Sequence, residues 1–288
     1  NQDRKSMDTK EFYTKLLSLV LPITFQQLML TVVSASDALM VGAIGQDLLS
    51  AVSLASQVTF VYNLFLAAMS IGTSIFAAQY WGKGDKEAVE KILAIVLRIS
   101  LTVSVVFFVA ATFCPGLLMK IFTPDAVLIR YGNEYLQIVG LTYLLCGISQ
   151  IYLCIMKNSS LASRSMVIGS TAALLNIVLN AIFIYGLFGA PRMEIAGAAV
   201  ATTISRLIEF VWVLVEHSKK DRIKIRISYM VRPDIILRKD FWRYTLPVLG
   251  NELVWGGGFT MYSVIMGHLG TDAVAANSIA NIVKNLIA

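Results

Sequence analysis

Asp37 is a single carboxylate near the far end of a long apolar stretch that begins near Thr14. An acid in the middle of a bilayer costs about 3 kcal/mol on insertion scales, so such acids usually have a task. In a low-dielectric cavity a carboxylate should have a raised proton affinity. It can bind a proton, bind Na⁺, or attract an organic cation. The alternative is a carboxylate that Ser, Asn and backbone groups satisfy inside a structural bend.

Glu252 is a second acid without an obvious basic neighbour within one helical turn. It follows Pro247 and precedes Trp255 and three glycines, which indicate close packing or a hinge. The same functional and structural readings apply to it as to Asp37. Together with Glu252, six polar or aromatic residues are candidates for lining a substrate cavity: Gln26, Tyr62, Asn63, Tyr143, Gln150 and Trp255.

Asn176 and Asn180 stand four residues apart in an otherwise apolar segment. Residues at this spacing share one face of a helix. Two amides inside an apolar helix need polar partners. They can supply oxygens to a cation such as Na⁺ or hold Asp37, and joining neighbouring helices is an open alternative.

The remaining charges within apolar stretches favour structural roles. Arg206 and Glu209 are spaced to pair with each other on one helix. Arg98 is expected to reach the surface or to pair with an acid, whereas Lys284 cannot be judged from its surroundings. Enzyme signatures are missing from the sequence, since it has no Gly-rich phosphate loop and its two histidines are far apart. We therefore expect no enzyme activity, no cofactor and no ATP-driven pump.

The elements that position these residues are membrane spans. Of 288 residues, 57% are hydrophobic and only 15% are charged, against about 25% charged in soluble domains. Apolar blocks of about 20 residues are typical of helices that cross a bilayer. Spans are predicted at about 14–41, 49–80, 88–113, 134–156, 166–187, 195–215 and 242–267, with an eighth from about 273. A polar link or a short surface helix is expected at 125–133, between the third and fourth spans.

Basic residues orient these spans. Counted over alternate loops, 18 Lys or Arg residues fall on one side and 3 on the other. The positive-inside rule then places the N-terminus in the cytoplasm, together with a long basic segment at 216–241. The net charge of +6 is explained by these loops, so nucleic-acid binding is not expected.

The chain also repeats itself. Leu21-Pro22 aligns without gaps to Leu246-Pro247, and the glycines and aspartate of the following turn recur, with Asp47 matching Asp272. We expect the two aspartates to cap the next helix. The second copy begins six spans after the first, an even number, so both halves enter the membrane in the same direction. The position that matches Asp37 is Tyr262, so the acid is not repeated.

The predicted fold is an all-α integral membrane protein with a six-helix N-terminal lobe and the first one or two helices of a pseudo-symmetric parallel second lobe. The expected division is 1–215 for the first lobe, 216–241 for a cytoplasmic basic linker and 242–288 for the start of a truncated second lobe. The chain starts with Asn1 and stops within an apolar segment, so we expect it to be part of a longer product.

Five groups of short motifs match one transporter family. They are Asp37-x-x-Met40-Val41-Gly42-x-x-Gly45, Gln79-Tyr80-Trp81-Gly82-x-Gly84, Asn176-Ile177-Val178-Leu179-Asn180, Gly197-Ala198-Ala199-Val200-Ala201-Thr202, and Leu246-Pro247 with Gly267-His268-Leu269-Gly270. By these motifs the chain resembles the multidrug and toxic compound extrusion (MATE) family over essentially its whole length. The resemblance implies twelve helices in two lobes and export of organic cations in exchange for H⁺ or Na⁺.

One branch, the DNA-damage-inducible type, is similar in its first-helix acid, which matches Asp37. For that branch the resemblance implies a cation site that also uses Asn176, Asn180 and Thr202. Members often carry aspartate where this chain has Asn180, and this loss of one charge modestly favours a proton over Na⁺. Glu252 resembles the helix-seven acid of other members only approximately in position.

The expected function is therefore a secondary antiporter for cationic drugs or metabolites. It is expected to be a monomer in the plasma membrane, or in the inner membrane of a Gram-negative cell. The alternatives are a lipid-linked oligosaccharide flippase or polysaccharide exporter of the same superfamily, and a membrane receptor or scaffold whose acids are structural. A flippase should have a strongly cationic cavity, whereas the predicted cavity is acidic and lined by amides.

Overall fold

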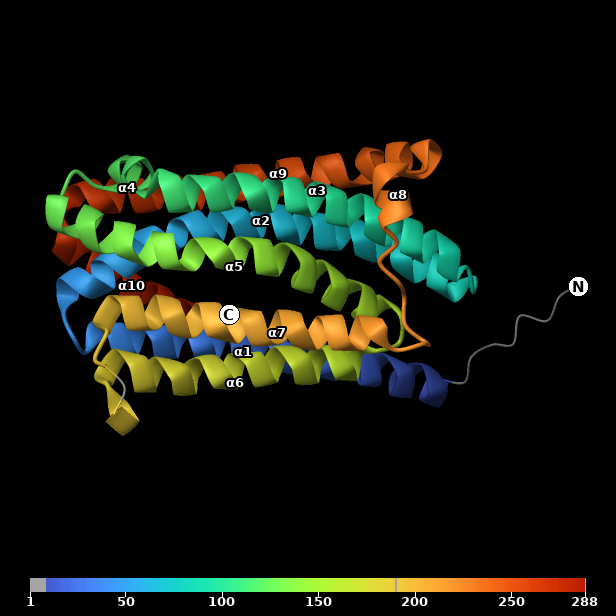
Figure 1. The fold of residues 1–288 in the computed structure, drawn as a ribbon, viewed down its shortest axis with the longest axis horizontal. Coiled ribbons are helices and arrows are strands. Elements are labelled where there is room, and N and C mark those ends of the chain that lie inside the picture. The colour runs from blue at the N-terminus through green and yellow to red at the C-terminus, as the bar shows by residue number, and fades with distance from the viewer. Residues whose placement is uncertain (1–8, 190, 288) are drawn as a thin grey trace, which may run out of the picture.

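The computed structural model describes residues 9–189 and 191–287, and in those ranges the chain is helical with no strand (Figure 1). The α-helices are α1 (Thr9–Gly42), α2 (Gln46–Gly82), α3 (Lys86–Phe113), α4 (Pro115–Phe122), α5 (Ala126–Asn158), α6 (Ala162–Tyr185), α7 (Glu194–Ser218), α8 (Ile227–Val231), α9 (Ile235–Leu269) and α10 (Thr271–Ile287). A short 3₁₀ turn, η1 (Leu187–Gly189), follows α6.

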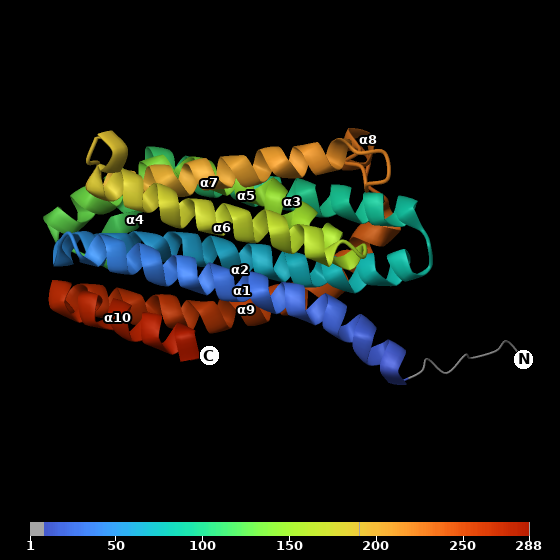
Figure 2. The same cartoon turned by 90° about the horizontal axis from the view of Figure 1, so that it is seen from below.

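The long helices lie side by side along one axis (Figures 1 and 2). Six of them, α1 from Leu16 onwards, α2, α3, α5, α6 and α7, are long and apolar enough to cross a membrane. This confirms the prediction of an all-α, multi-pass membrane fold. α9 is 35 residues long but is not one of the six. Its glycines and polar residues lower its mean hydropathy.

Two local predictions are wrong. The stretch 125–133, expected to be a polar link or a short surface helix ahead of the fourth span, is instead the N-cap and first turns of the long helix α5. The carboxylate of the N-cap Asp125 accepts a hydrogen bond from the Val127 amide at 2.8 Å. The expected caps Asp47 and Asp272 lie inside the first turns of their helices. The N-cap of α2 is Gly45, which has no side chain to cap with. Acids in a first turn still interact favourably with the helix dipole.

The repeat is visible in space. α1 and α9 each contain a proline, run in the same direction, and are followed by α2 and α10 (Figure 2). Ser53 and Ser278 are matched in the gapless alignment, and the Ser278 hydroxyl donates a hydrogen bond of 2.6 Å to the Ser53 hydroxyl. In a two-fold arrangement, equivalent residues meet each other only near the axis. The pseudo-two-fold axis therefore passes close to this serine pair.

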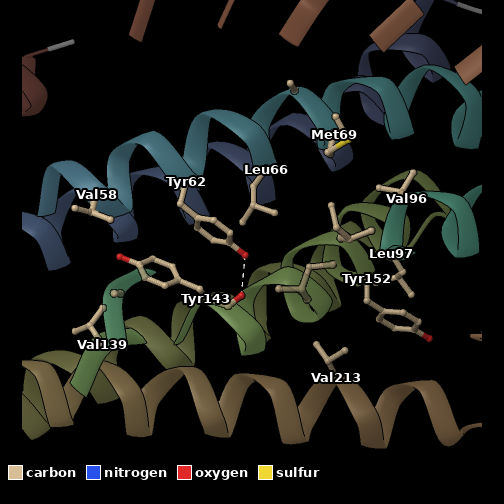
Figure 3. Close-up of a cluster of buried hydrophobic side chains, with 14 of the residues drawn as sticks. Val58, Tyr62, Leu66, Met69, Val96, Leu97, Val139, Tyr143, Tyr152 and Val213 are labelled. Atoms are coloured by element: carbon tan, nitrogen blue, oxygen red, sulfur yellow. Dashed lines mark hydrogen bonds between the residues drawn. The ribbon is translucent and has the colours of Figure 1, made fainter. Parts of the chain in front are cut away.

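The core of the bundle joins α2, α3 and α5 around Tyr62 and Tyr143 (Figure 3). Each of the two side chains is 1% exposed. Tyr62 donates to the Tyr143 carbonyl at 2.8 Å and lies 2.8 Å from the Ser104 hydroxyl, while the Tyr143 hydroxyl lies 3.0 Å from that of Thr59. Both tyrosines were expected to line a substrate cavity. Instead, the bundle itself satisfies their hydroxyls, and they lie in the packed core of this conformation.

We expect Tyr62→Phe to destabilise the bundle by about 1–3 kcal/mol, because it leaves the buried Tyr143 carbonyl and Ser104 hydroxyl without this partner. A thermal unfolding midpoint of the purified protein in detergent measures the effect. Tyr131→Phe is the matched control, since the Tyr131 hydroxyl makes no hydrogen bond within the described part of the chain. Equal midpoints for the two variants would contradict the assigned role of the Tyr62 hydroxyl.

The basic segment after α7 is fastened to the helix ends by two carboxylates. Glu216 accepts from Arg222 at 3.1 Å and from Lys219. Glu90 at the start of α3 accepts from the Lys224 amide at 3.1 Å and from Arg226 at 2.5 Å. The second bond raises the pKa of the Arg226 guanidinium above its ordinary value. The segment lies at the same end of the bundle as the N-terminal end of α1 (Figure 1).

Candidate functional site

Asp37 lies in the last part of α1, against α6. Asn180 of α6 is fully buried and donates a hydrogen bond from its amide nitrogen to one carboxylate oxygen of Asp37. The two residues are 143 positions apart in the chain. The fold therefore brings together two groups that the sequence predicts as partners.

A chain of hydrogen bonds continues from Asn180 to α7. The Asn180 amide nitrogen also lies 3.2 Å from the Asn176 side-chain oxygen, and Asn176 donates to the Thr202 hydroxyl at 3.2 Å. Thr202 donates in turn to the Ala198 carbonyl at 3.0 Å. The spacing of four residues places both asparagines on the face of α6 that meets α1 and α7. The asparagines thus hold Asp37 and join helices at once, so the two roles that the sequence left open coexist.

One oxygen in this series of hydrogen bonds can still accept a hydrogen bond or bind a cation. The side-chain oxygen of Asn180 is buried and has no hydrogen-bond partner among the described residues. Buried polar atoms are usually paired, so an orphan requires an explanation. Together with the Asp37 carboxylate and the Thr202 hydroxyl, it provides oxygen ligands of the kind that a hard cation accepts. The residues present therefore fit either a proton on Asp37 or a small cation beside it.

A cavity of about 80 Å³ opens beside Asp37 between α1, α6 and α7. This volume is enough for several water molecules, each of which needs about 15 Å³ on the same measure. The cavity is lined by Leu30, Val33, Asp37, Ala172, Ala173, Asn176, Thr202, Ser205 and Arg206. Its charged groups are one acid and one base, and the rest of its lining is small, apolar or neutral.

Arg206 is a charged residue of the lining whose location beside Asp37 was not predicted from the sequence. Its predicted pairing with Glu209 is confirmed by an Nη1–Oε2 distance of 2.8 Å. Its place beside Asp37 was missed. The available signal was its spacing: Arg206 follows Thr202 by four residues, so the two share one face of α7.

Other candidates lie elsewhere. Gln26 of α1 is 4% exposed and packs against Gly169 of α6, with its side-chain oxygen unpaired among the described residues. Gln150 of α5 donates to Glu209 at 2.8 Å and so contacts the Arg206 pair rather than Asp37. Neither residue belongs to the lining of the cavity beside Asp37.

The candidates on α9 are also separate from this cavity. Trp255 of α9 stands 6.3 Å from the ring of Phe60 on α2 and 4.7 Å from that of Phe259. Glu252 is half-buried on α9, and Asn63 of α2 is exposed. The fold does not bring these three residues to Asp37, and their assignment to a substrate cavity stays a prediction.

These features define a multi-pass helical membrane protein with a charged, polar cavity inside one bundle. Residues 22–182 match the family model described as MatE. The chain belongs to this family.

Curated relatives agree with this assignment. A probable multidrug resistance protein NorM of Thermotoga maritima is 25% identical over 286 residues, which are 97% of this chain and 60% of that protein. The multidrug resistance protein NorM of Photobacterium profundum is 27% identical over 270 residues, covering 92% of this chain and 59% of that protein. The chain therefore spans about 60% of the length of these relatives.

Solved structures share the fold. An inward-facing multidrug resistance MATE family transporter of the MOP superfamily superposes with a TM-score of 0.75 at 23% identity, over 91% of this chain and 59% of that chain. An outward-facing structure with the same description superposes with a TM-score of 0.73 at 21% identity, over 94% of this chain and 64% of that chain. The six-helix lobe and the start of a parallel second lobe are therefore the MATE architecture.

Proposed function

We propose that this chain is part of a secondary antiporter that exports organic cations in exchange for H⁺ or Na⁺. Membership of the MatE family and the names of the curated relatives support multidrug efflux. The observation that carries the ion-coupling step is the carboxylate of Asp37, held by Asn180 and facing the intramembrane cavity.

In this proposal the coupling ion acts on the contact between α1 and α6. A proton on Asp37 removes the negative charge that accepts a hydrogen bond from the Asn180 amide, and a Na⁺ ion beside Asp37 compensates that charge. The preferred position of α1, which contains Pro22, then changes relative to α6 and α7. Coupling requires that the ion binds the two conformations with different affinity. Release of the drug on the outer side would follow from that difference.

The charge inventory of the cavity favours a proton. The lining holds one acid, Asp37, and one base, Arg206, which is paired with Glu209. The amides of Asn176 and Asn180 contribute no charge. A Na⁺ ion would bind to Asp37, Asn176, Asn180 and Thr202, with a single carboxylate to neutralise it. We keep Na⁺ as the alternative coupling ion because the orphan Asn180 oxygen is a suitable ligand.

The wider organisation follows the repeat. We propose a first lobe at 1–215, a cytoplasmic linker at 216–241 and the beginning of a second lobe at 242–288, working by alternating access of the lobes. We also propose that the N-terminus lies in the cytoplasm and that the protein is a monomer in the plasma or inner membrane. The count of basic residues supports the orientation.

A flippase for lipid-linked oligosaccharides is less well supported. Its pyrophosphate cargo would need a cavity with several unpaired positive charges. The base beside Asp37 is Arg206, and Glu209 neutralises it at 2.8 Å. The cavity beside Asp37 is therefore not strongly cationic.

The test is transport by the complete gene product in proteoliposomes. We expect a pH gradient imposed without a Na⁺ gradient to drive ethidium in the direction opposite to proton flow. A Na⁺ gradient imposed at constant pH should drive less ethidium movement or none. Empty vesicles are the control for ethidium leakage. Ethidium movement that neither gradient changes would contradict the antiporter proposal.

A further inference from the structure

Glu209 on α7 is a buried acid that the transport proposal does not use. It is 1% exposed, and both of its carboxylate oxygens are engaged. One accepts from the Ser149 hydroxyl at 2.9 Å and the Gln150 amide at 2.8 Å, and the other binds Arg206 at 2.8 Å. Three donors from α5 and α7 therefore hold this carboxylate in one place.

Arg206 connects this acid to the cavity of Asp37. It pairs with Glu209 on one side and lines the cavity on the other. Removing one partner from a buried ion pair leaves an uncompensated charge, whereas removing both together can be neutral. The pair therefore sets how much positive charge Asp37 experiences.

We propose that Arg206 is a tethered cation that weakens the binding of a proton or another cation to Asp37, and that Glu209 limits this effect by neutralising Arg206. The pair would tune the affinity of the coupling site without touching the ion. This inference rests on the proposed function of Asp37 as the coupling acid. It makes Arg206 and Glu209 specificity-determining residues that act through Asp37.

The groups around the site allow the sign to be derived. From α7, the charged groups are Arg206 and Glu209. From α6, Asn176 and Asn180 are neutral. From α5, Tyr135 lies within electrostatic reach of Asp37, Cys146 within reach of the α7 pair, and Lys157 within reach of Glu209. Because the α5 groups are unchanged in every variant below, differences between variants report on the α7 pair.

Opposite shifts are therefore expected from the two single substitutions. Arg206→Gln removes the positive charge and leaves Glu209, so Asp37 should hold its proton to a higher pH, by about one pH unit. Glu209→Gln leaves Arg206 uncompensated, so Asp37 should lose its proton at a lower pH by a similar amount. The double variant removes a neutral pair and should stay close to the wild-type value, and so should Arg206→Lys, which keeps the charge.

The experiment follows the carboxylic-acid band of protonated Asp37 by infrared spectroscopy during a pH titration of the complete, purified protein in lipid. Each variant is compared with the same variant carrying Asp37→Asn, so that a proton taken up by Glu209 is subtracted. A purely structural pair would lower thermal stability in both single variants and leave the titration midpoint of Asp37 in place. Unchanged midpoints, or shifts in the same direction, would overturn the inference.

A charge swap covers the case in which a single variant does not fold. Arg206→Glu combined with Glu209→Arg keeps an ion pair on α7 but exchanges the sign of the group that lines the cavity. It should raise the midpoint of Asp37, and a midpoint equal to the wild type or below it would count against the inference.

The readout also separates this inference from the antiporter proposal. If Asp37→Asn abolishes efflux while the midpoints of the α7 variants do not move, the inference fails and the antiporter stands. If the midpoints move in opposite directions while efflux does not depend on Asp37, the electrostatic relation stands and the coupling role of Asp37 fails.

Discussion

Replacing Asp37 with asparagine is expected to reduce gradient-driven ethidium efflux to the level of empty vesicles. The substitution keeps the shape and one oxygen of the side chain, so Asn180 can still donate to it and the fold should persist. It removes the charge that a proton or Na⁺ neutralises. Without differential ion binding, the gradient has no means of shifting the conformational equilibrium.

Asp47→Asn is the matched control for this prediction. Asp47 is an acid ten residues further along the chain, exposed in the first turn of α2, and its counterpart Asp272 recurs in the second copy of the repeat. It should leave efflux unchanged. Thermal midpoints in detergent should show that neither substitution unfolds the protein. Asp37→Asn removes a half-buried charge that is costly to desolvate, and Asp47 is exposed, where substitutions usually change stability little. Wild-type efflux by Asp37→Asn would show that another group couples transport to the gradient.

The sequence was sufficient to identify the acid and the two asparagines but not their contact. Asp37 stands out because charge is costly inside an apolar span, and Asn176 and Asn180 stand out through their helical spacing. The hydrogen bond from Asn180 to Asp37 joins α6 to α1, and only the packing of those helices determines it. Periodicity within one helix says which residues share a face, not which helix that face meets.

The same limit applies to the tyrosines and to the second neighbour of Arg206. A hydroxyl in a span suggests a polar cavity, yet a crossing of α2 with α3 and α5 can satisfy it completely, as it does for Tyr62. The pairing of Arg206 with Glu209 was local in sequence and was predicted correctly. Its second neighbour, the cavity of Asp37, depends on how α1 and α6 lie against α7.

The repeat carried information of a different kind. Because it compares the chain with itself, it predicted a parallel arrangement of α1 with α9 without any knowledge of contacts. The hydrogen bond between the matched Ser53 and Ser278 supports the same symmetry independently. The repeat also separates scaffold from site, since the turn glycines recur and Asp37 does not.

Gly197→Ala is expected to be the most damaging small substitution in the first lobe. A methyl group at Gly197 would lie 2.7 Å from the carbonyl carbon and oxygen of Phe183 and 3.0 Å from the Ile184 nitrogen. These are backbone atoms of α6 and cannot rotate away, so α6 and α7 must separate. Overpacking of this kind costs about 1–3 kcal/mol.

The same separation should reach the candidate site. Thr202 lies five residues after Gly197 on α7, and its 3.2 Å hydrogen bond with Asn176 depends on the close approach of the two helices. Gly197→Ala should therefore lower the thermal unfolding midpoint and also weaken gradient-driven efflux by the protein that remains folded. Small residues such as Ala198 and Ala201, buried on the same helix, are typical of such close contacts between membrane helices.

Gly82→Ala provides the control at the end of α2, where a methyl group would have no neighbour within 4 Å. It should change the free energy of unfolding by no more than about 0.5 kcal/mol, as surface substitutions usually do. Equal stability of Gly197→Ala and Gly82→Ala would contradict the close packing of α7 against the Phe183 backbone of α6. If Gly197→Ala were destabilised yet kept full efflux, the bond between Asn176 and Thr202 would not be needed to hold Asn180 on Asp37.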